Sequence, residues 1–449
     1  MADSHIHHRS RQRVIRAANI RRVPKVWGEE RWIVNRAYCG KQLLLKKNHR
    51  CSLHAHGEKD EVFFLLSGRV LLEVGRERLT LEEGDVVHIR PGEYHRFTGL
   101  KDSVIVEFST HHREADSFRR TASGHIEPER YERQSSLLRA FARQRILVVG
   151  DVMLDRYVFG SAERLSQEAP IPVIRVASTR DVLGGAANSA ANIAALGAHV
   201  HLCGVIGDDS AGHRIAKLAA SSGLNTSLIT DNTRPTTEKE RVVAGQSQVV
   251  RVDREDRSIL SSPIEKKLLA AIRRGAKRAT AILVSDYAKG LLTPRVLRTL
   301  IRIAHTKHIP LVLDPKPHSS YGLRDLRGVT VITPNLAEVR ALVGYPHGGV
   351  RTVGTLATRA MKGHVLITRG ADGLDLYVRN GLLFHADSLA PEVVDVSGAG
   401  DTVSGVVALC LAAGASMHDA ADVANRAAAV VVTKQGTATL TLDELSSSL

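Results

Sequence analysis

The hydrophobic pattern of this 449-residue chain changes near residue 145, and this change limits the folds that the chain can adopt. Before it, between Val23 and Phe108, short runs of alternating apolar and polar residues end at glycines. Short strands at regular spacing are typical of an all-β barrel or sandwich. After it, buried strand-like runs such as Ile146–Gly150 alternate with longer helical stretches. That alternation predicts a doubly wound α/β sheet with helices on both faces.

The two patterns divide the chain into four parts. We expect an all-β domain over residues 23–110 and an α/β domain over residues 145–449, joined by a charged linker over residues 111–144 that has few β-branched residues. Residues 1–22 form a basic N-terminal arm. The arm and the residues just after it carry Arg9, Arg11, Arg13, Arg16, Arg21, Arg22 and Lys25.

The formal charge of +15 raises the question of nucleic-acid binding. Aromatic residues make up only 4% of the chain, and no zinc finger, RNA-binding aromatic motif or helix-turn-helix accompanies the basic arm. Nucleic acid is therefore not an expected partner. A basic surface also attracts anionic small substrates such as sugar phosphates and nucleotides, which fits the motifs below better.

The sequence favours a cytoplasmic location. It has no run of roughly 18 apolar residues that could span a membrane, and the basic N-terminus lacks the apolar core of a signal peptide. The four cysteines are widely separated and form no CxxC pair, so neither a disulfide framework nor a zinc knuckle is expected.

A glycine-rich turn, Gly398-Ala399-Gly400-Asp401, precedes a helical run of small residues. Such a turn presents free backbone N–H groups and the positive end of the helix dipole to an anion, here a phosphoryl group in transfer. Asp401 could accept the proton of an attacking hydroxyl. The alternative is a tight turn in which Asp401 only caps the helix. The sequence has no GxxxxGK[ST] motif, so Walker-type phosphate binding is excluded.

From residue 145 onward the chain resembles the ribokinase-like (PfkB) carbohydrate kinases. It carries both signatures of that family, Gly184–Asn188 early and Asp395–Thr402 late. Within the family it is most similar to the bacterial heptose 7-phosphate kinases of lipopolysaccharide-core precursor synthesis. The segments that carry this resemblance are GDVMLDRY, QEAPIPV, SDYAKG, DPK, TPNLAE and KQGTATL.

The resemblance implies a role for each matching position. Asp401 matches the catalytic base, and Gly398, Ala399 and Gly400 match the anion hole. The segment Asn335-Leu336-Ala337-Glu338 matches the nucleotide and magnesium segment, with Asn335 near the phosphates and Glu338 near a hydrated Mg²⁺. The resemblance also places Thr368, Arg369, Gly370 and Asn425 at the nucleotide; the alternative is that they are ordinary loop and helix residues.

Sugar-contacting positions of the family match Asp155, Gly184, Gly185 and Asn188. Lys289 and Lys316 stand at strand ends and could meet a phosphate already carried by the sugar, or they could be solvated surface lysines. Relatives often dimerise through a small β-lid. The segments Tyr157–Ala177 and Thr237–Asp253 could form such a lid and a homodimer interface.

The N-terminal domain carries His54, His56 and Glu61 at close spacing, followed by His95. Two histidines two residues apart on a strand face the same side, so with Glu61 and His95 they could form a three-histidine, one-glutamate site for Fe, Mn, Ni or Zn. The alternative is a set of exposed histidines on a sheet. The pattern resembles small cupins, a jelly-roll family, and is most similar to the cupin domain of type II mannose-6-phosphate isomerases. The departures at Arg90, Gly99 and His54 leave open whether this cupin isomerises a sugar phosphate or only senses one.

Together these resemblances imply a cytoplasmic fusion of a metal-binding cupin and an ATP- and Mg²⁺-dependent sugar kinase. The expected reaction phosphorylates D-glycero-D-manno-heptose 7-phosphate at its anomeric hydroxyl. The alternative is a PfkB kinase for another sugar or sugar phosphate, with a cupin that does not catalyse a reaction.

Overall fold

The computed structural model describes residues 16–449 apart from positions 76, 120, 122, 126–127, 246, 318–319, 391–392 and 435. The chain divides into two compact units, one ending at Glu132 and the other covering Arg133–Leu449. Each unit has its own hydrophobic core.

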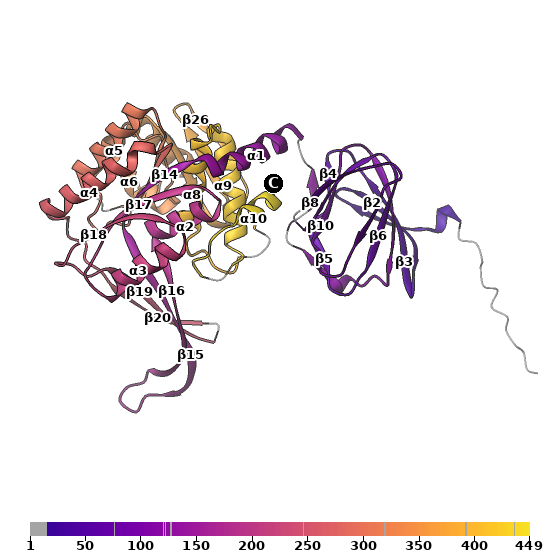
Figure 1. The fold of residues 1–449 in the computed structure, drawn as a ribbon, viewed down its shortest axis with the longest axis horizontal. Coiled ribbons are helices and arrows are strands. Elements are labelled where there is room, and N and C mark those ends of the chain that lie inside the picture. The colour runs from indigo at the N-terminus through magenta and orange to yellow at the C-terminus, as the bar shows by residue number, and fades with distance from the viewer. Residues whose placement is uncertain are drawn as a thin grey trace, which may run out of the picture. The chain divides into compact units, whose positions relative to one another are not determined.

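The N-terminal unit consists of two antiparallel sheets (Figure 1). The first has the order β1-β2-β3-β11-β6-β9, and the second contains β12-β5-β10-β4-β13 with β7 and β8 attached through β10. The strands of the first sheet are β1 (Arg21–Lys25), β2 (Gly28–Asn35), β3 (Tyr38–Leu45), β6 (Glu61–Ser67), β9 (Val86–Ile89) and β11 (Ser103–Thr110). Those of the second are β4 (His49–Arg50), β5 (His54–His56), β7 (Arg69–Val74), β8 (Glu77–Glu82), β10 (His95–Gly99), β12 (Ser117–Arg119) and β13 (Gly124–His125).

The alternation of buried and exposed side chains explains why the two sheets pack face to face. In β6, Phe63 and Leu65 are buried and their neighbours are less so, and Ile105 is buried in the paired strand β11. Because successive side chains point to opposite faces of a sheet, one face of each sheet can line a common core. The jelly-roll architecture expected for a cupin is confirmed.

The expected domain boundaries differ from the structure in two places. Strand β1 begins at Arg21, inside the predicted arm, and pairs along its whole length with β2; arm residues 1–15 lie outside the described part of the chain. The predicted linker 111–144 contributes β12 and β13 to the second sheet, paired with β5 and β4. Its polar composition concealed these two short edge strands. Helix α1 (Pro128–Ala140) follows them.

The C-terminal unit is built on a nine-stranded sheet of order β18-β17-β14-β21-β22-β23-β24-β25-β26, parallel as far as β24. Its strands are β14 (Arg145–Gly150), β17 (His199–Ile206), β18 (Asn225–Thr230), β21 (Ala281–Ser285), β22 (Leu311–Asp314), β23 (Val331–Ile332), β24 (His364–Thr368), β25 (Leu374–Val378) and β26 (Gly381–Ala386). The helices after α1 are α2 (Ala186–Ala195), α3 (Ser210–Ser221), α4 (Ser262–Gly275), α5 (Pro294–Lys307), α6 (Leu336–Val343), α7 (Val350–Met361), α8 (Ala399–Ala412), α9 (Met417–Val431) and α10 (Leu442–Ser448).

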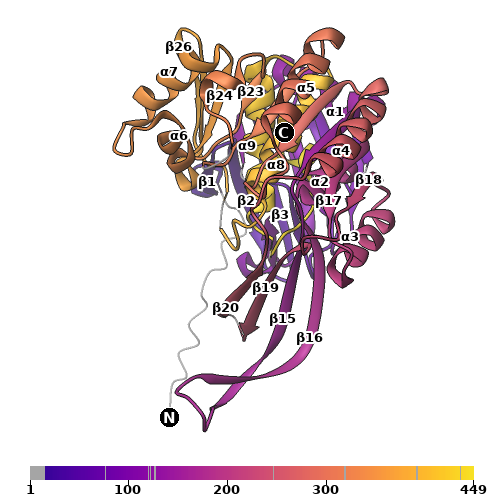
Figure 2. The same cartoon turned by 90° about the vertical axis from the view of Figure 1, so that its left-hand side faces the viewer.

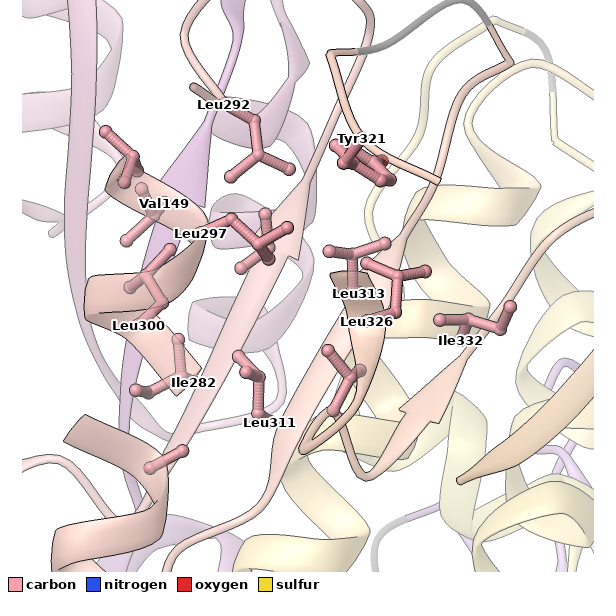
Figure 3. Close-up of a cluster of buried hydrophobic side chains, with 14 of the residues drawn as sticks. Val149, Ile282, Leu292, Leu297, Leu300, Leu311, Leu313, Tyr321, Leu326 and Ile332 are labelled. Atoms are coloured by element: carbon pink, nitrogen blue, oxygen red, sulfur yellow. The ribbon is translucent and has the colours of Figure 1, made fainter. Parts of the chain in front are cut away.

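The continuous apolar strands are explained by helices on both faces of this sheet. On one face Val149, Ile282 and Leu311 pack with Leu297 and Leu300 of α5 (Figure 3). On the other face α2 and α8 contact β14 and β21. The expected doubly wound α/β fold is confirmed.

A second, smaller sheet extends from the α/β body (Figure 2). It has the order β16-β15-β19-β20, and we call it the small sheet. Its strands are β15 (Val152–Leu165), β16 (Pro172–Gly185), β19 (Thr237–Ala244) and β20 (Ser247–Arg254). The four strands contain most of the two predicted lid segments, Tyr157–Ala177 and Thr237–Asp253. Strands β15 and β16 also extend beyond the first segment toward the α/β body. Strand β15 starts two residues after β14 ends, so the root of the small sheet lies at the carboxyl edge of the large one.

Candidate active site at the carboxyl edge of the sheet

Asp401 lies in the first turn of α8 and is buried, with 3% of its surface exposed. Its carboxylate accepts three side-chain hydrogen bonds, from Asn188 Nδ2 at 2.8 Å, Ser189 Oγ at 2.9 Å and the Tyr287 hydroxyl at 2.9 Å. We call these four residues the Asp401 network. The donors come from α2 and from the loop after β21, so the network joins three elements that are distant in sequence.

Burial raises the pKa of Asp401 above its ordinary value, whereas the hydrogen bonds from Asn188, Tyr287 and Ser189 and the nearby Lys316 ammonium lower it. A carboxylate with a raised pKa is a stronger base, which suits a group that removes a proton from a hydroxyl. The arrangement goes beyond a helix cap, since the carboxylate oxygens bond to other elements and not to backbone N–H groups of α8.

The pH dependence of activity should respond to the loss of one of these donors. In Tyr287→Phe the ring remains but the hydroxyl that stabilises the charged carboxylate is removed, so the pKa of Asp401 rises further. Because the base acts when deprotonated, the acid limb of the kcat/KM profile should move to higher pH. The pH–rate profiles of both proteins measure this, and coincident acid limbs would show that Tyr287 does not act on the base.

The glycine turn before α8 has two glycines with different requirements. Gly398 has a φ of +80°, and a Cβ there would lie 2.8 Å from Asn188 Nδ2. Only glycine adopts this conformation easily, and a side chain would also displace a donor of the Asp401 network. A Cβ on Gly400 would meet nothing within 4 Å. Open space at the N-terminus of a helix suits an incoming anion.

Alanine at these two positions should separate stability from activity. Gly398→Ala is expected to lose about 1–3 kcal/mol of unfolding free energy through backbone strain. Gly400→Ala should keep or raise stability, by up to about 1 kcal/mol, because alanine favours helix. Its methyl group would nevertheless occupy the space proposed for the phosphoryl group, so kcat should fall. Thermal unfolding and initial rates test both variants; full activity in Gly400→Ala would remove Gly400 from the anion hole.

The loop after β21 is held by Asp151, whose Oδ2 accepts hydrogen bonds from the backbone N–H groups of Tyr287 and Lys289. Burial and the neighbouring Asp286 raise the pKa of Asp151. The Asp286 carboxylate in turn accepts hydrogen bonds from the Ala288 N–H and the Tyr321 hydroxyl. These contacts fix the position from which Tyr287 reaches Asp401.

A second group of charged residues lies near Asp401. Asp314, at the end of β22, is buried, and its pKa is raised well above the ordinary value by burial and by the carboxylates of Glu338 and Asp401. The Lys316 ammonium opposes this effect and forms an ion pair with Glu338. A buried carboxylate that lacks full charge compensation, beside a second one, fits the oxygen ligands that Mg²⁺ prefers.

The predicted nucleotide segments come together in part. Asn335 caps α6: its side chain accepts from the Glu338 N–H at 2.9 Å, and Glu338 Oε2 accepts from the Asn335 N–H at 2.8 Å. Thr368 bridges to Asn335, and its N–H donates to the Pro334 carbonyl. Leu336 and Ala337 are in the first turn of α6.

The other predicted nucleotide residues make separate contacts. Arg369 forms ion pairs with Asp372 and Asp375, each at 3.3 Å, and Gly370 follows it with a φ of +60°. Asn425, on α9, donates to the Asp387 carbonyl at 2.8 Å. Arg369 and Asn425 thus make polar contacts within the protein, while the Nε atom of Arg369 is buried without a hydrogen-bond partner among the described residues.

The predicted sugar positions surround the root of the small sheet. Asp155 on β15 pairs with Arg241 on β19 at 2.6 Å. A Cβ on Gly184 would lie 2.4 Å from Asp155 Oδ2, and one on Gly185 would lie 2.4 Å from the Asp151 carbonyl oxygen. Both glycines therefore permit close approach of the two strands, and Asn188 follows in α2 as part of the Asp401 network.

The prediction that Lys289 and Lys316 contact a phosphate of the sugar stays a prediction, and both lysines already have carboxylate partners within the protein. Lys289 forms an ion pair with Glu255, and Lys316 forms one with Glu338. The sequence showed the two lysines but not the distant carboxylates that compensate their charge.

In the N-terminal unit, His54, His56, Glu61 and His95 line one pocket together with Lys59 and other residues. The His54–His95 ring centroids are 4.5 Å apart, and His95 Nε2 lies 3.3 Å from Glu61 Oε2. The Nδ1 atom of each histidine lies 2.8–3.1 Å from a backbone carbonyl oxygen. Because a carbonyl only accepts, each Nδ1 carries the proton and each Nε2 keeps a lone pair.

Burial lowers the pKa of His54 and of His95 to about 4, so both rings are neutral at pH 7. Glu61 Oε2 is buried and accepts no hydrogen bond from the described residues. Neutral imidazoles and a free carboxylate oxygen suit a transition metal.

However, no group of three or more His, Cys, Asp or Glu side chains in the described part of the chain is close enough to hold a metal ion. The Lys59 ammonium contacts Glu61 and compensates its charge. The donors are present, but they do not form a complete coordination sphere.

Sequence reasoning did not identify Tyr287, Ser189 or Asp314 as site residues. Tyr287 and Asp314 stand within the SDYAKG and DPK segments, directly after strands β21 and β22. Their position at the carboxyl ends of parallel strands was a usable signal, since ligands bind at that edge of open α/β sheets. Ser189 gave no signal apart from its place in the helix that begins after Gly185.

All four cysteines are free and buried in the structure. Among the described helices, none is both long enough and apolar enough to cross a membrane.

Comparisons with known proteins identify the families. A model of the pfkB family of carbohydrate kinases matches residues 143–444, and a cupin domain model matches residues 42–113. A "D-beta-D-heptose 7-phosphate kinase" from Bordetella bronchiseptica is 45% identical over 68% of this chain and 96% of its own length. A "Bifunctional protein HldE" from Caulobacter sp. is 44% identical over 69% of this chain and 64% of its own length. The chain thus spans about two thirds of the length of the bifunctional relatives that it matches.

Solved structures support the fold. Ribokinase from Arabidopsis thaliana, complexed with ribose and ATP, has a TM-score of 0.53 and 20% identity, covering 67% of this chain and 97% of its own. Phosphofructokinase-2 from Escherichia coli, in complex with potassium, has a TM-score of 0.55 and 18% identity, covering 67% and 96%. Both similarities lie at the level of the ribokinase-like fold. The family model, the curated relatives and the arrangement around Asp401 agree, and the chain belongs to the pfkB family of carbohydrate kinases, with a cupin domain preceding the kinase domain.

Proposed function

We propose that this chain transfers the γ-phosphoryl group of ATP to the anomeric hydroxyl of D-glycero-D-manno-heptose 7-phosphate in the cytoplasm. The product is the 1,7-bisphosphate used for lipopolysaccharide-core precursors. The observation that carries the proposal is the buried Asp401, held by three donors at the N-terminus of α8, in a chain 45% identical to a heptose 7-phosphate kinase.

In this proposal Asp401 accepts the proton of the anomeric hydroxyl as its oxygen attacks the γ-phosphorus. A bond forms between that oxygen and phosphorus, and the bond from the γ-phosphorus to the oxygen of the leaving ADP breaks. The backbone N–H groups in the first turn of a helix have no partners within it, so those of Gly398 and Gly400 can stabilise the charge on the transferred group, whereas the Ala399 N–H donates to the Val396 carbonyl. Phosphoryl transfer relies mainly on positioning and charge neutralisation, which these groups supply.

The nucleotide and its metal are assigned to the edge beyond β22. Asn335–Glu338, Thr368–Gly370 and Asn425 are proposed to bind ATP. Asp314 and Glu338 are the residues that would hold Mg²⁺, directly or through water. When bound, Mg²⁺ neutralises the charge of the phosphate oxygens. Asp155, Gly184, Gly185 and Asn188 are proposed to bind the sugar.

The cupin domain is proposed to bind one transition metal through His54, His56, Glu61 and His95, and to interconvert a ketose phosphate and its aldose. When bound, the metal would polarise a sugar carbonyl. Metal loading would require Lys59 to release Glu61, and the neighbouring Glu107, 2.5 Å from Lys59 Nζ, can retain the lysine. With the kinase blocked by Asp401→Asn, exchange between the two sugars isolates this activity. Metal without exchange supports a sensing role.

The small sheet is proposed as a homodimer interface. Its strands expose large apolar side chains that have no cover within the described chain, Leu165, Val176, Val249, Val250 and Val252, and Ile171 in the connection between β15 and β16 is exposed as well. Sedimentation of the wild type and of a variant with charges at Val250 and Val252 would test it.

ADP release, measured across a panel of free and phosphorylated sugars, tests the proposed reaction. We expect the highest kcat/KM with heptose 7-phosphate. A higher value with another sugar would establish the alternative, a pfkB kinase of different specificity.

A further inference from the structure

The small sheet places an uncompensated cation beside the Asp401 network. Lys239 lies on β19, in register with Asp155 on β15 and Asp253 on β20. Its Nζ lies 5.3 Å from the ring centroid of Tyr287, the residue whose hydroxyl bonds to Asp401. The phenol ring of Tyr287 therefore links Lys239 to Asp401, the proposed base.

The electrostatic state of Lys239 differs from that of the other cations around it. Arg241, two residues further on the same strand, pairs with Asp155, whereas Lys289 and Lys316 pair with Glu255 and Glu338. Within the described part of the chain, Lys239 has no carboxylate partner within 4.0 Å and makes no side-chain hydrogen bond.

The surroundings of Lys239 favour an anion. Burial, together with the positive charges of Lys289 and Arg241, lowers the pKa of Lys239, while Asp155 and Asp253 only partly oppose this. A half-buried ammonium that contacts an aromatic ring and no carboxylate loses hydration, and a doubly charged phosphate group compensates for that loss.

We propose that Lys239 forms the subsite for the phosphate that the sugar substrate already carries, and so determines the preference for a phosphorylated sugar. This inference rests on the proposed function, since it assumes a sugar phosphate whose hydroxyl is held by Asp401. The sugar would extend past Tyr287, with its reacting hydroxyl at Asp401 and its phosphate at the root of the small sheet. Lys239 acts on binding at the end remote from the reacting atoms.

The experiment compares heptose 7-phosphate with free heptose in the wild type, Lys239→Met, Lys239→Arg and the control Lys266→Met, at an exposed position on α4. In Lys239→Met, kcat/KM for the 7-phosphate should fall about 10- to 100-fold, mainly through KM, the expected loss of a charge-assisted contact. The value for the free sugar should be unchanged. Lys239→Arg should recover most of the loss, and Lys266→Met should match the wild type.

Two results would overturn the subsite: equal losses for the two sugars, which would place Lys239 at the nucleotide or the base, or no loss for the 7-phosphate. The proposed function is tested separately by the wild type alone. If the wild type prefers another phosphorylated sugar, the same variants are compared on that sugar and its free form. A fall in kcat/KM for the phosphorylated form alone still supports Lys239 as the phosphate subsite. If the wild type prefers free sugars throughout, both proposals fall.

Discussion

Asp401→Asn is expected to lower kcat by about 10²- to 10⁴-fold, the usual contribution of a general base, with little change in ATP binding. Asparagine has nearly the same size, but it cannot accept the proton. Its amide also carries two N–H groups, and the side chains of Asn188, Ser189 and Tyr287 already donate to this position, so at least one of them must turn to accept or lose its contact.

The control for this variant is Asp419→Asn. Asp419 is also a buried aspartate in the first turn of a helix, α9, where it contacts Ser416 and Arg133 instead of the Asp401 network. It should lose some stability but keep its turnover. Steady-state rates and ATP titrations of both variants test whether Asp401 is the general base. Near-normal turnover in Asp401→Asn would refute that assignment.

We expect the wild-type protein to retain about one transition-metal ion per chain and the double variant with alanine at His54 and His56 to retain none, because the remaining two ligands bind weakly. ATP-dependent phosphorylation should persist, since the cupin and kinase domains have separate cores. Elemental analysis of the purified proteins gives the metal content.

His88→Ala is the matched control, because His88 lies on strand β9 of the same domain with about half of its side chain exposed. It should keep its metal. A wild-type protein without metal after growth in supplemented medium would contradict the metal site, and loss of metal from His88→Ala would show a general effect on the domain.

The sequence alone was sufficient for the two folds, because each has a strong periodic signature. The alternation in β6 and β11 and the buried runs of β14 and β21 are local properties of the chain. The short strands β12 and β13 were missed, since three or two residues carry no detectable period and pair only through contacts with β5 and β4.

The candidate site was predicted less completely. Asp401 could be found because its glycine turn is a local motif, but the partners of a charge are set by tertiary structure. The sequence showed Lys316 and Lys289 but not their partners Glu338 and Glu255, and it gave no motif for Lys239, whose ammonium lies over the Tyr287 ring. Likewise, the spacing of the histidines indicated a metal site, and only the structure showed Lys59 against Glu61.

The most direct test of the central claim is phosphorus NMR of the product formed by the wild-type protein from ATP and D-glycero-D-manno-heptose 7-phosphate. The account predicts a second phosphomonoester signal coupled to the anomeric proton, with one ADP formed for each sugar consumed and no such product with Asp401→Asn. A new phosphate on any other hydroxyl, or no product from this sugar, would contradict it.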